Sequence, residues 1–361
     1  MELLRKFSRT LSDPKSKLFW IIVNFGRVPV LVRRRRFGAL ASYFIAGVTG
    51  RSVYDYYLRY LAQRSKGTLE QEIRGNTMEL DLRDEGLSRD LFIYGIREER
   101  GAEVFERELE KVAGSVDDET VLDIGANIGY FALIELGALT DTASLVAFEP
   151  DERNTKLLER NLELNGYRDR TTIERAAVGP ERGVVDFELA EHRNLNKVRA
   201  ASTADPTYET GRTITVDEWS IDEYLQAHEI DPESVVAARM DVEGYEVEVV
   251  RGMKKLLESD GPLVLSLEIH PGRLDSSEIR DLGRVLEECG FDVVEALVES
   301  ISAYPFVKTC TKAVQSTGSL PTDGPAYNVV LVKTPAGGSS KTNRDEESST
   351  DRETRVKQLS D

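Results

Sequence analysis

The stretch Val121-Leu-Asp-Ile-Gly-Ala-Asn-Ile-Gly-Tyr-Phe131 decides the fold of this chain. Residues 120–124 form an apolar, β-branched run that contains one acid, which predicts a short buried strand. Gly125 and Gly129 permit a tight turn and a close approach of a ligand to the backbone, and residues 130–137 are typical of a helix. A strand, a glycine-spaced turn and a helix in this order predict a ligand at the helix N-terminus.

The spacing within this turn indicates which ligand. A dinucleotide site has the pattern G-x-G-x-x-G, whereas this turn keeps only Gly125 and Gly129 and places Asp123 before them. A pyrophosphate is met by bare backbone amides, but S-adenosylmethionine offers an amino group and a sulfonium cation that attract a carboxylate. The turn therefore favours S-adenosylmethionine over a nicotinamide dinucleotide. The alternative is an ordinary strand, turn and helix without a ligand.

A second acid follows the next predicted strand. Residues 144–150, Ser-Leu-Val-Ala-Phe-Glu-Pro, place Glu149 twenty-four residues after Gly125, where such folds bind the ribose hydroxyls. Glu149 is therefore the predicted ribose ligand, with a helix-capping acid as the alternative. Residues 171–179 predict a third strand, in which Ala177 is small enough to lie beside a flat adenine ring.

Two later strands also end in titratable side chains. Residues 235–246, Val-Val-Ala-Ala-Arg-Met-Asp-Val-Glu-Gly-Tyr-Glu, contain the fourth strand, and residues 262–270, Pro-Leu-Val-Leu-Ser-Leu-Glu-Ile-His, the fifth. Their ends carry Asp241, Glu243, Glu268 and His270. Further strands are predicted at residues 77–82, 183–189, 212–219, 291–297 and 327–332, and further helices at 98–112, 152–165, 244–259 and 276–289.

Charge is distributed unevenly along the chain. Residues 1–66 hold fourteen Lys and Arg against three acids, a net charge of +11, so the remainder carries −28 of the total −17. Such an acidic body repels phosphates and argues against nucleic acid as a partner. The combination of strong acidity with only fourteen lysines against thirty-three arginines is typical of proteins that work in molar salt, a halophilic type of composition.

The two cysteines, Cys289 and Cys310, have no metal-site spacing, and no cleavable signal is evident, which predicts a cytoplasmic protein. Within residues 18–48, two apolar runs flank Arg33-Arg-Arg-Arg36, and each is shorter than the roughly 20 residues of a membrane span. These runs predict either a helical cap on the domain or peripheral contact with the inner face of a membrane.

Three regions are expected. Residues 1–75 form a basic, partly apolar helical extension. Residues 76–333 form the enzyme domain, whose first part, 76–115, acts as a lid. Residues 334–361 are polar and charged and predict a disordered tail. Neither the oligomeric state nor the acceptor follows from these features.

The motifs together resemble the FkbM-type S-adenosylmethionine-dependent methyltransferases over about residues 76–333. The resemblance rests on Val121-Leu-Asp-Ile-Gly-Ala-Asn-Ile-Gly129, Ala147-Phe-Glu-Pro150, Ala176-Ala-Val-Gly179, Met240-Asp-Val-Glu-Gly-Tyr-Glu246 and Leu267-Glu-Ile-His270, in this order. The first motif is common to many methyltransferases, whereas Asp-Val-Glu-Gly-x-Glu followed by a strand that ends in Glu-Ile-His is more specific.

The resemblance implies an α/β, Rossmann-like sheet of seven strands, the last antiparallel, with helices on both faces. It also implies O-methylation of a hydroxyl, commonly on a sugar, glycan or related small molecule. By the same resemblance the amino-acid end of the cofactor is held by Asp123, Gly125, Asn127 and Gly129, and the ribose by Glu149. The residues expected to face the acceptor are Asp241, Glu243, Glu268 and His270.

Two mechanisms and two other functions remain open at this point. His270 is the preferred base for the acceptor hydroxyl, because a positioned imidazole contributes about 10²–10⁴-fold; alternatively Asp241 and Glu268 hold a divalent cation. The rival functions are a nicotinamide-dependent sugar oxidoreductase and a catalytically inactive module that docks on a membrane. The missing middle glycine argues against the first, and the intact acids argue against the second.

Overall fold

The computed structural model describes residues 61–65, 67–84, 86–190, 196–198, 209–298, 310–312, 314 and 316–333. Most of the predicted basic extension and all of the predicted disordered tail lie outside these residues. The membrane contact predicted for residues 18–48 lies outside them as well, so these three expectations stay predictions. Among the described helices, none has the length and apolar character needed to cross a membrane.

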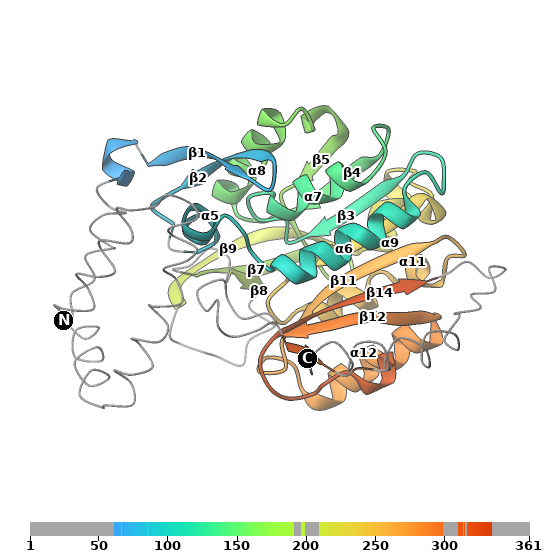
Figure 1. Ribbon diagram of the computed structural model, residues 1–361. Coiled ribbons are helices and arrows are strands. Elements are labelled where there is room, and N and C mark those ends of the chain that lie inside the picture. Colours follow the sequence, from blue (N-terminus) through green and yellow to red (C-terminus); the bar gives the residue numbers. More distant parts are fainter. Residues whose placement is uncertain are drawn as a thin grey trace, which may run out of the picture.

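A mostly parallel sheet of eight strands forms the centre of the domain (Figure 1). Its spatial order is β5 (Thr171–Glu174), β4 (Ser144–Phe148), β3 (Thr120–Ile124), β10 (Val235–Met240), β11 (Leu263–Ile269), β14 (Tyr327–Lys333), β12 (Phe291–Val298) and β13 (Cys310–Lys312). Strand β14 is antiparallel to both neighbours. The predicted seven strands and the antiparallel last strand are confirmed, and β13 adds an eighth at the edge.

Helices cover both faces of this sheet, which explains why β3 and β10 are buried along their whole length. On one face Val121 and Ala237 join a core with α6, α7 and α8; on the other Leu122 and Ala238 join a core with α9, α11 and α12. The helices are α6 (Glu99–Val112), α7 (Tyr130–Ala138), α8 (Glu152–Leu164), α9 (Ile221–Ala227), α10 (Glu246–Arg251), α11 (Lys254–Glu258) and α12 (Ser276–Glu288).

The prediction of one strand over residues 171–179 is wrong. The chain leaves the main sheet after β5, and residues 176–178 pair with residues 217–219 in a second sheet. This four-stranded sheet has the order β6 (Ala176–Val178), β9 (Glu209–Trp219), β7 (Gly183–Ala190) and β8 (Lys197–Val198). The split brings the end of β6 over the carboxyl end of the main sheet, where it contributes to a cavity.

The single helix expected over residues 244–259 is also wrong, because the chain forms α10 and α11 with a break at Gly252. A side chain at Gly252 would place its Cβ 2.0 Å from the carbonyl oxygen of Gly179. The close contact between these two backbones holds the break in place.

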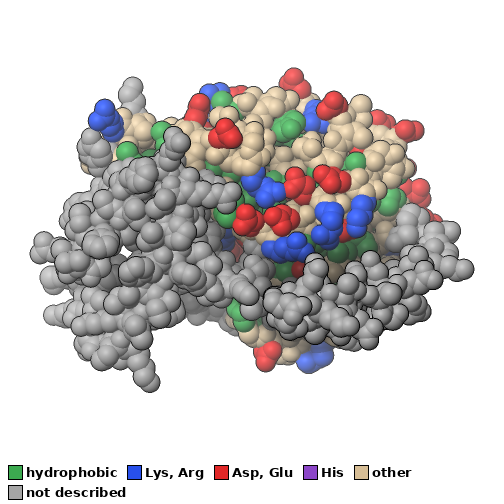
Figure 2. Space-filling model, viewed as in Figure 1, with side chains coloured by type: hydrophobic (Ala, Val, Ile, Leu, Met, Phe, Trp, Pro, Cys, Tyr) green, Lys and Arg blue, Asp and Glu red, His purple; other side chains and the backbone are tan. Residues whose placement is uncertain are grey.

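The segment before β3 packs on the domain through a hairpin that was only half predicted. Strand β1 (Thr68–Ile73) pairs with β2 (Asn76–Asp81), and α5 (Leu87–Tyr94) follows. The backbone amide of Thr77 donates to the side chain of Asn165, the C-cap of α8, at 3.0 Å, and that of Glu79 donates to Asn161 on α8 at 2.6 Å. Figure 2 shows acidic and basic side chains mixed over the described part of the visible face.

The topology predicts where a ligand binds. The chain continues from β3 to β4 on one side, whereas β10 lies on the other side of β3. The carboxyl ends of β3 and β10 therefore form the point at which the strand order reverses, the usual ligand position in open α/β sheets.

Candidate active site

Two neighbouring cavities lie at the carboxyl ends of β3 and β10. The first cavity encloses about 550 Å³, part of it open to solvent, and extends under β4 and β6. The second cavity encloses about 410 Å³, also partly open, and extends toward α5 and the start of α6. Their shared wall consists of Gly125, Asn127, Asp241 and Glu243.

The turn after β3 is held by close backbone contacts. The amides of Gly125 and Ala126 both donate to the carbonyl of Phe148, at 2.9 and 3.0 Å. Gly125 has φ +85°, and a Cβ there would lie 2.2 Å from the carbonyl oxygen of Asp241. Gly129 has φ +87°, and a Cβ there would lie 2.7 Å from Cδ1 of Leu158, so glycine is required at both positions for local reasons.

Glu149 lies where the second acid was expected, in the wall of the first cavity. Its carboxylate accepts hydrogen bonds from the amides of Asn127 at 2.9 Å and Asp151 at 2.8 Å. Burial, the largest effect, raises the pKa of Glu149 to about 8, although these two amides lower it. Ala177 lines the same cavity, as predicted for a neighbour of a flat ring.

Asp123 does not line either of these two cavities and is fully buried. Its Oδ1 lies 3.3 Å from Nη1 of Arg239, and burial raises its pKa. Gly129 also lies outside both walls. The sequence predicted that Asp123 and Gly129 contact the ligand, but neither residue lines a cavity in this geometry. Gly125 and Asn127, which were also predicted, do line both cavities.

Arg239 connects Asp123 to the second cluster of acids. Its Nη2 lies 3.3 Å from Oδ2 of Asp241, and its guanidinium lies over the Phe131 ring at 3.8 Å. Although burial lowers its pKa, Asp123 and Asp241 raise it further, so Arg239 stays charged. The remaining Oδ1 of Asp241 is buried without a hydrogen-bond partner in the described structure. Oδ1 of Asp241, in the wall between the two cavities, is thus available as a hydrogen-bond acceptor.

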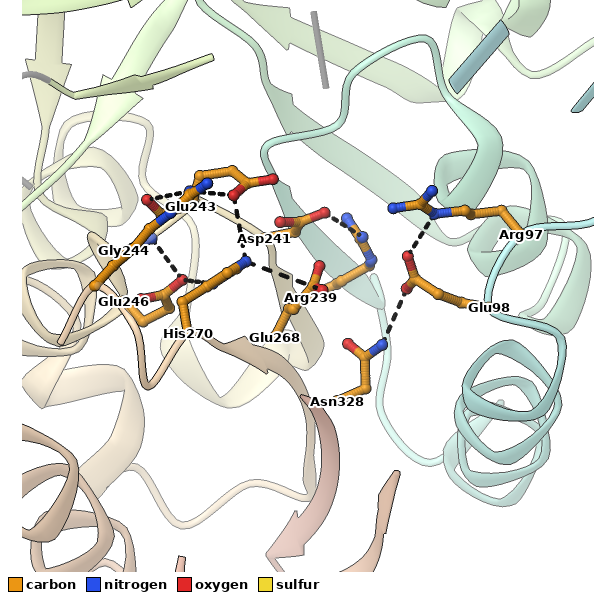
Figure 3. A network of polar contacts seen from close by, with 11 residues as sticks. Arg97, Glu98, Arg239, Asp241, Glu243, Gly244, Glu246, Glu268, His270 and Asn328 are labelled. Atoms are coloured by element: carbon orange, nitrogen blue, oxygen red, sulfur yellow. Dashed lines mark hydrogen bonds and ion pairs between the residues drawn. The ribbon is translucent and has the colours of Figure 1, made fainter. Parts of the chain in front are cut away.

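His270 lies among three carboxylates (Figure 3). Nδ1 is 2.8 Å from Oε1 of Glu246, and Nε2 is 3.3 Å from Glu243 and 4.0 Å from Glu268. Burial alone lowers the pKa of His270, but these carboxylates raise it to about 10. The ring is therefore an imidazolium at neutral pH, which removes the lone pair that the predicted base needs.

The two acids beside His270 differ in their surroundings. Burial raises the pKa of Glu243 to about 7, although His270 and Arg273 lower it. Arg273 donates to both the side chain and the backbone carbonyl of Glu243. Burial, followed by the charges of Asp241 and Glu98, raises the pKa of Glu268 well above its ordinary value.

A metal ion is a second use for these side chains. One ligand atom each from Asp241, Glu243 and His270 lies within 4.8 Å of the others, so Glu243 and His270, rather than the predicted Glu268, accompany Asp241. In this arrangement Arg239 and Arg273 already pair with the two acids and His270 is protonated. A divalent cation bound here would compete with these positive charges for the same ligand atoms.

The structure thus brings the four predicted acceptor-facing residues together and adds others that the sequence reading missed. The missed residues are Arg97, Glu98, Arg239 and Arg273. Only Arg239 had a sequence signal, since an arginine within the apolar run of β10 needs a buried partner.

The sheet order and the site define a Rossmann-like methyltransferase. Residues 123–293 match the sequence model of the methyltransferase FkbM domain. The chain thus carries an FkbM-type methyltransferase domain at residues 123–293, and the predicted resemblance to this family and the methyltransferase class are confirmed.

The chain is 29% identical over 191 residues to the hexuronic acid methyltransferase AglP of Haloferax volcanii, covering 53% of this chain and 71% of that protein. Among solved structures, a putative rRNA methylase from Clostridium thermocellum has 12% identity and a TM-score of 0.38, covering 66% of this chain and 97% of that one. An O-methyltransferase from Thermotoga maritima has 13% identity and a TM-score of 0.33, with 65% of each chain covered.

Proposed function

We propose that this protein transfers a methyl group from S-adenosylmethionine to a hydroxyl of a sugar, glycan or related acceptor. The observation that carries the proposal is the pair of adjoining cavities, which share a wall that contains the unpartnered Oδ1 of Asp241. A group-transfer enzyme needs two such spaces in contact, because holding donor and acceptor at reacting distance supplies up to about 7–11 kcal/mol.

The first cavity fits the cofactor. It lies at the carboxyl ends of β3 and β4, and its wall combines apolar side chains with a few polar ones, as is usual for cofactor sites. The Glu149 carboxylate can accept hydrogen bonds from a ribose diol, and the small Ala177 leaves room for a purine. In this proposal Asp123 does not touch the cofactor. Its carboxylate pairs with Arg239 and so holds the guanidinium of Arg239 in place. When bound, S-adenosylmethionine supplies an electrophilic methyl group.

Asp241 replaces His270 as the proposed base. Its Oδ1 has no hydrogen-bond partner among the described residues, whereas its Oδ2 pairs with the Arg239 guanidinium. Asp241 therefore accepts the proton that the acceptor hydroxyl loses as its oxygen forms the new bond to carbon. The His270 imidazolium, held by Glu246, orients Glu243 beside it.

The relative supports a sugar as the acceptor class. The Haloferax volcanii protein is a hexuronic acid methyltransferase, and the matched region covers 71% of that protein. The acidic composition suits molar salt, the condition under which we propose that this chain works. Activity and folding measured at low and at molar KCl test that point, and indifference to salt would refute it.

The experiment is a methyl-transfer screen with radiolabelled S-adenosylmethionine against D-glucuronate, D-galacturonate and glycan extracts from the source organism. Labelled product that survives mild alkali is an ether, as expected from a hydroxyl acceptor. Label released as methanol would identify a carboxylate ester, which needs no base, and would overturn the role of Asp241. Binding of NADH without binding of S-adenosylmethionine would favour the oxidoreductase, and cofactor binding without transfer to any acceptor would favour the inactive module.

A further inference from the structure

The second cavity has a wall that no motif predicted. Leu87 at the start of α5 and the pair Arg97–Glu98 before α6 face Asp241 and Glu243 across it. Figure 3 shows Arg97 and Glu98 on one side, His270 and Glu243 on the other, and Arg239 between them. The segment expected to serve only as a lid therefore supplies charged side chains to the site.

Backbone strain is concentrated at this cavity. Six described residues other than glycine have positive φ, and three of them line the second cavity: Glu98 at +47°, Asn127 at +52° and Glu243 at +55°. Each such conformation costs on the order of 1–3 kcal/mol, and it persists where the surroundings hold it. The three residues present their side chains from different segments to one space.

The Glu98 carboxylate is held at both oxygens. Oε1 accepts from Nε of Arg97 at 3.0 Å, and Oε2 accepts from Nδ2 of Asn328 at 3.1 Å. Arg97 is itself held, because its Nη1 bonds to Asp90 at 3.2 Å and its backbone exchanges hydrogen bonds with the Tyr130 hydroxyl. Glu98 is thus placed in a fixed geometry, and each carboxylate oxygen keeps a second lone pair.

The pairing of charges indicates the chemical class of the ligand. Both guanidinium groups in the wall, Arg97 and Arg239, are already matched by carboxylates. A purely apolar acceptor would strip water from these groups without replacing its hydrogen bonds. A compact anion without hydroxyls, such as phosphate, would meet like charge at Glu98 and Asp241 and offer no donors to them. Vicinal hydroxyls suit the wall, because each can donate to a carboxylate and accept from a guanidinium.

We propose that the second cavity binds the hydroxylated ring of the acceptor and that Glu98 is an acceptor-binding residue. This inference rests on the proposed function and adds the recognition of a polyol by the segment before β3. Glu98 accepts hydrogen bonds from ring hydroxyls, while the reacting hydroxyl lies toward Asp241 at the wall shared with the first cavity.

The test measures binding of D-glucose and D-glucuronate to the full chain saturated with S-adenosylhomocysteine, by saturation-transfer NMR. We expect the wild type to bind at least one of these sugars and Glu98→Gln to bind it at least about tenfold more weakly, since the charged acceptor is lost. The matched control is Glu103→Gln on α6, whose side chain is 51% exposed and pairs with Arg100, and its sugar binding should be unchanged.

Calorimetry with S-adenosylhomocysteine shows whether each variant is folded and keeps the first cavity. If Glu98→Gln does not fold, Leu87→Trp takes its place, because an indole at this wall fills the second cavity and should reduce sugar binding by at least about tenfold. Wild-type protein that binds neither sugar, or variants that bind it within twofold of wild type, would overturn the inference. If the wild-type protein does not bind S-adenosylhomocysteine, the proposed function is refuted instead.

Discussion

The two cavities share Gly125, Asn127, Asp241 and Glu243, but their other walls are built differently. The first cavity is closed mainly by strand ends and small or apolar residues, such as Ala177. The second adds the charged side chains of Arg97, Glu98 and Arg239 to apolar and aromatic ones, and Glu98 is held in place by Asn328, which is far away in the sequence. A cofactor that many enzymes share can be met by locally encoded turns, whereas an acceptor is recognised by side chains that only folding brings together.

The largest expected effect is a loss of turnover, without loss of cofactor binding, when the wall shared by the two cavities is changed. Asp241→Asn removes the proposed base with little change of shape, so kcat should fall by about 10²–10⁴-fold. The affinity for S-adenosylmethionine should stay within a few-fold, because the loss is confined to the transition state. Single-turnover methyl transfer and calorimetry measure the two quantities.

Two variants serve as comparisons for Asp241→Asn. Asp281→Asn, at a side chain that is 65% exposed on α12, should leave kcat unchanged. His270→Gln should retain more activity than Asp241→Asn, because an imidazolium is not the base. A greater loss in His270→Gln, together with loss of one limb of the pH–rate profile, would restore the histidine as the base.

The next effect tests the backbone contact at which the two cavities meet. Gly125→Ala combines φ +85° with a Cβ 2.2 Å from the carbonyl of Asp241, so it should lower the free energy of unfolding by about 3 kcal/mol or more. The control is Gly166→Ala, which has φ +76° and no atom within 4 Å of the new Cβ, and should cost about 1 kcal/mol. Urea unfolding of both variants gives the difference, and equal losses would show that the close approach contributes nothing.

The smallest effect concerns only the first cavity. Glu149→Gln should weaken S-adenosylmethionine binding at pH 9 by about 1.5–3 kcal/mol, because the ribose loses a charged acceptor. The pKa of Glu149 is raised to about 8, so its carboxyl is protonated below that pH, and wild-type affinity should increase by about tenfold from pH 7 to pH 9. The variant should lack this slope in calorimetric titrations. A wild-type affinity that is flat over this range would contradict the ribose assignment of Glu149.

Much of the fold could be predicted from local patterns. The run 120–124, the glycine turn and the acids that end successive strands marked β3, β4, β10 and β11, since strand period and turn chemistry are local properties. The split between β5 and β6 and the break between α10 and α11 could not be predicted. Both depend on partners elsewhere, namely residues 217–219 for β6 and Gly179 for the helix break.

The sequence by itself determined the residue types of the site and their order at the strand ends, including Glu149, Asp241 and His270. Only the tertiary structure decided which partners these side chains have and whether they carry a charge. Arg239 pairs with Asp123 from another strand, and three carboxylates turn His270 from a base into a cation. The physical reason is that burial and electrostatic interaction depend on distance in space, and these charges approach one another only when the strands pack side by side.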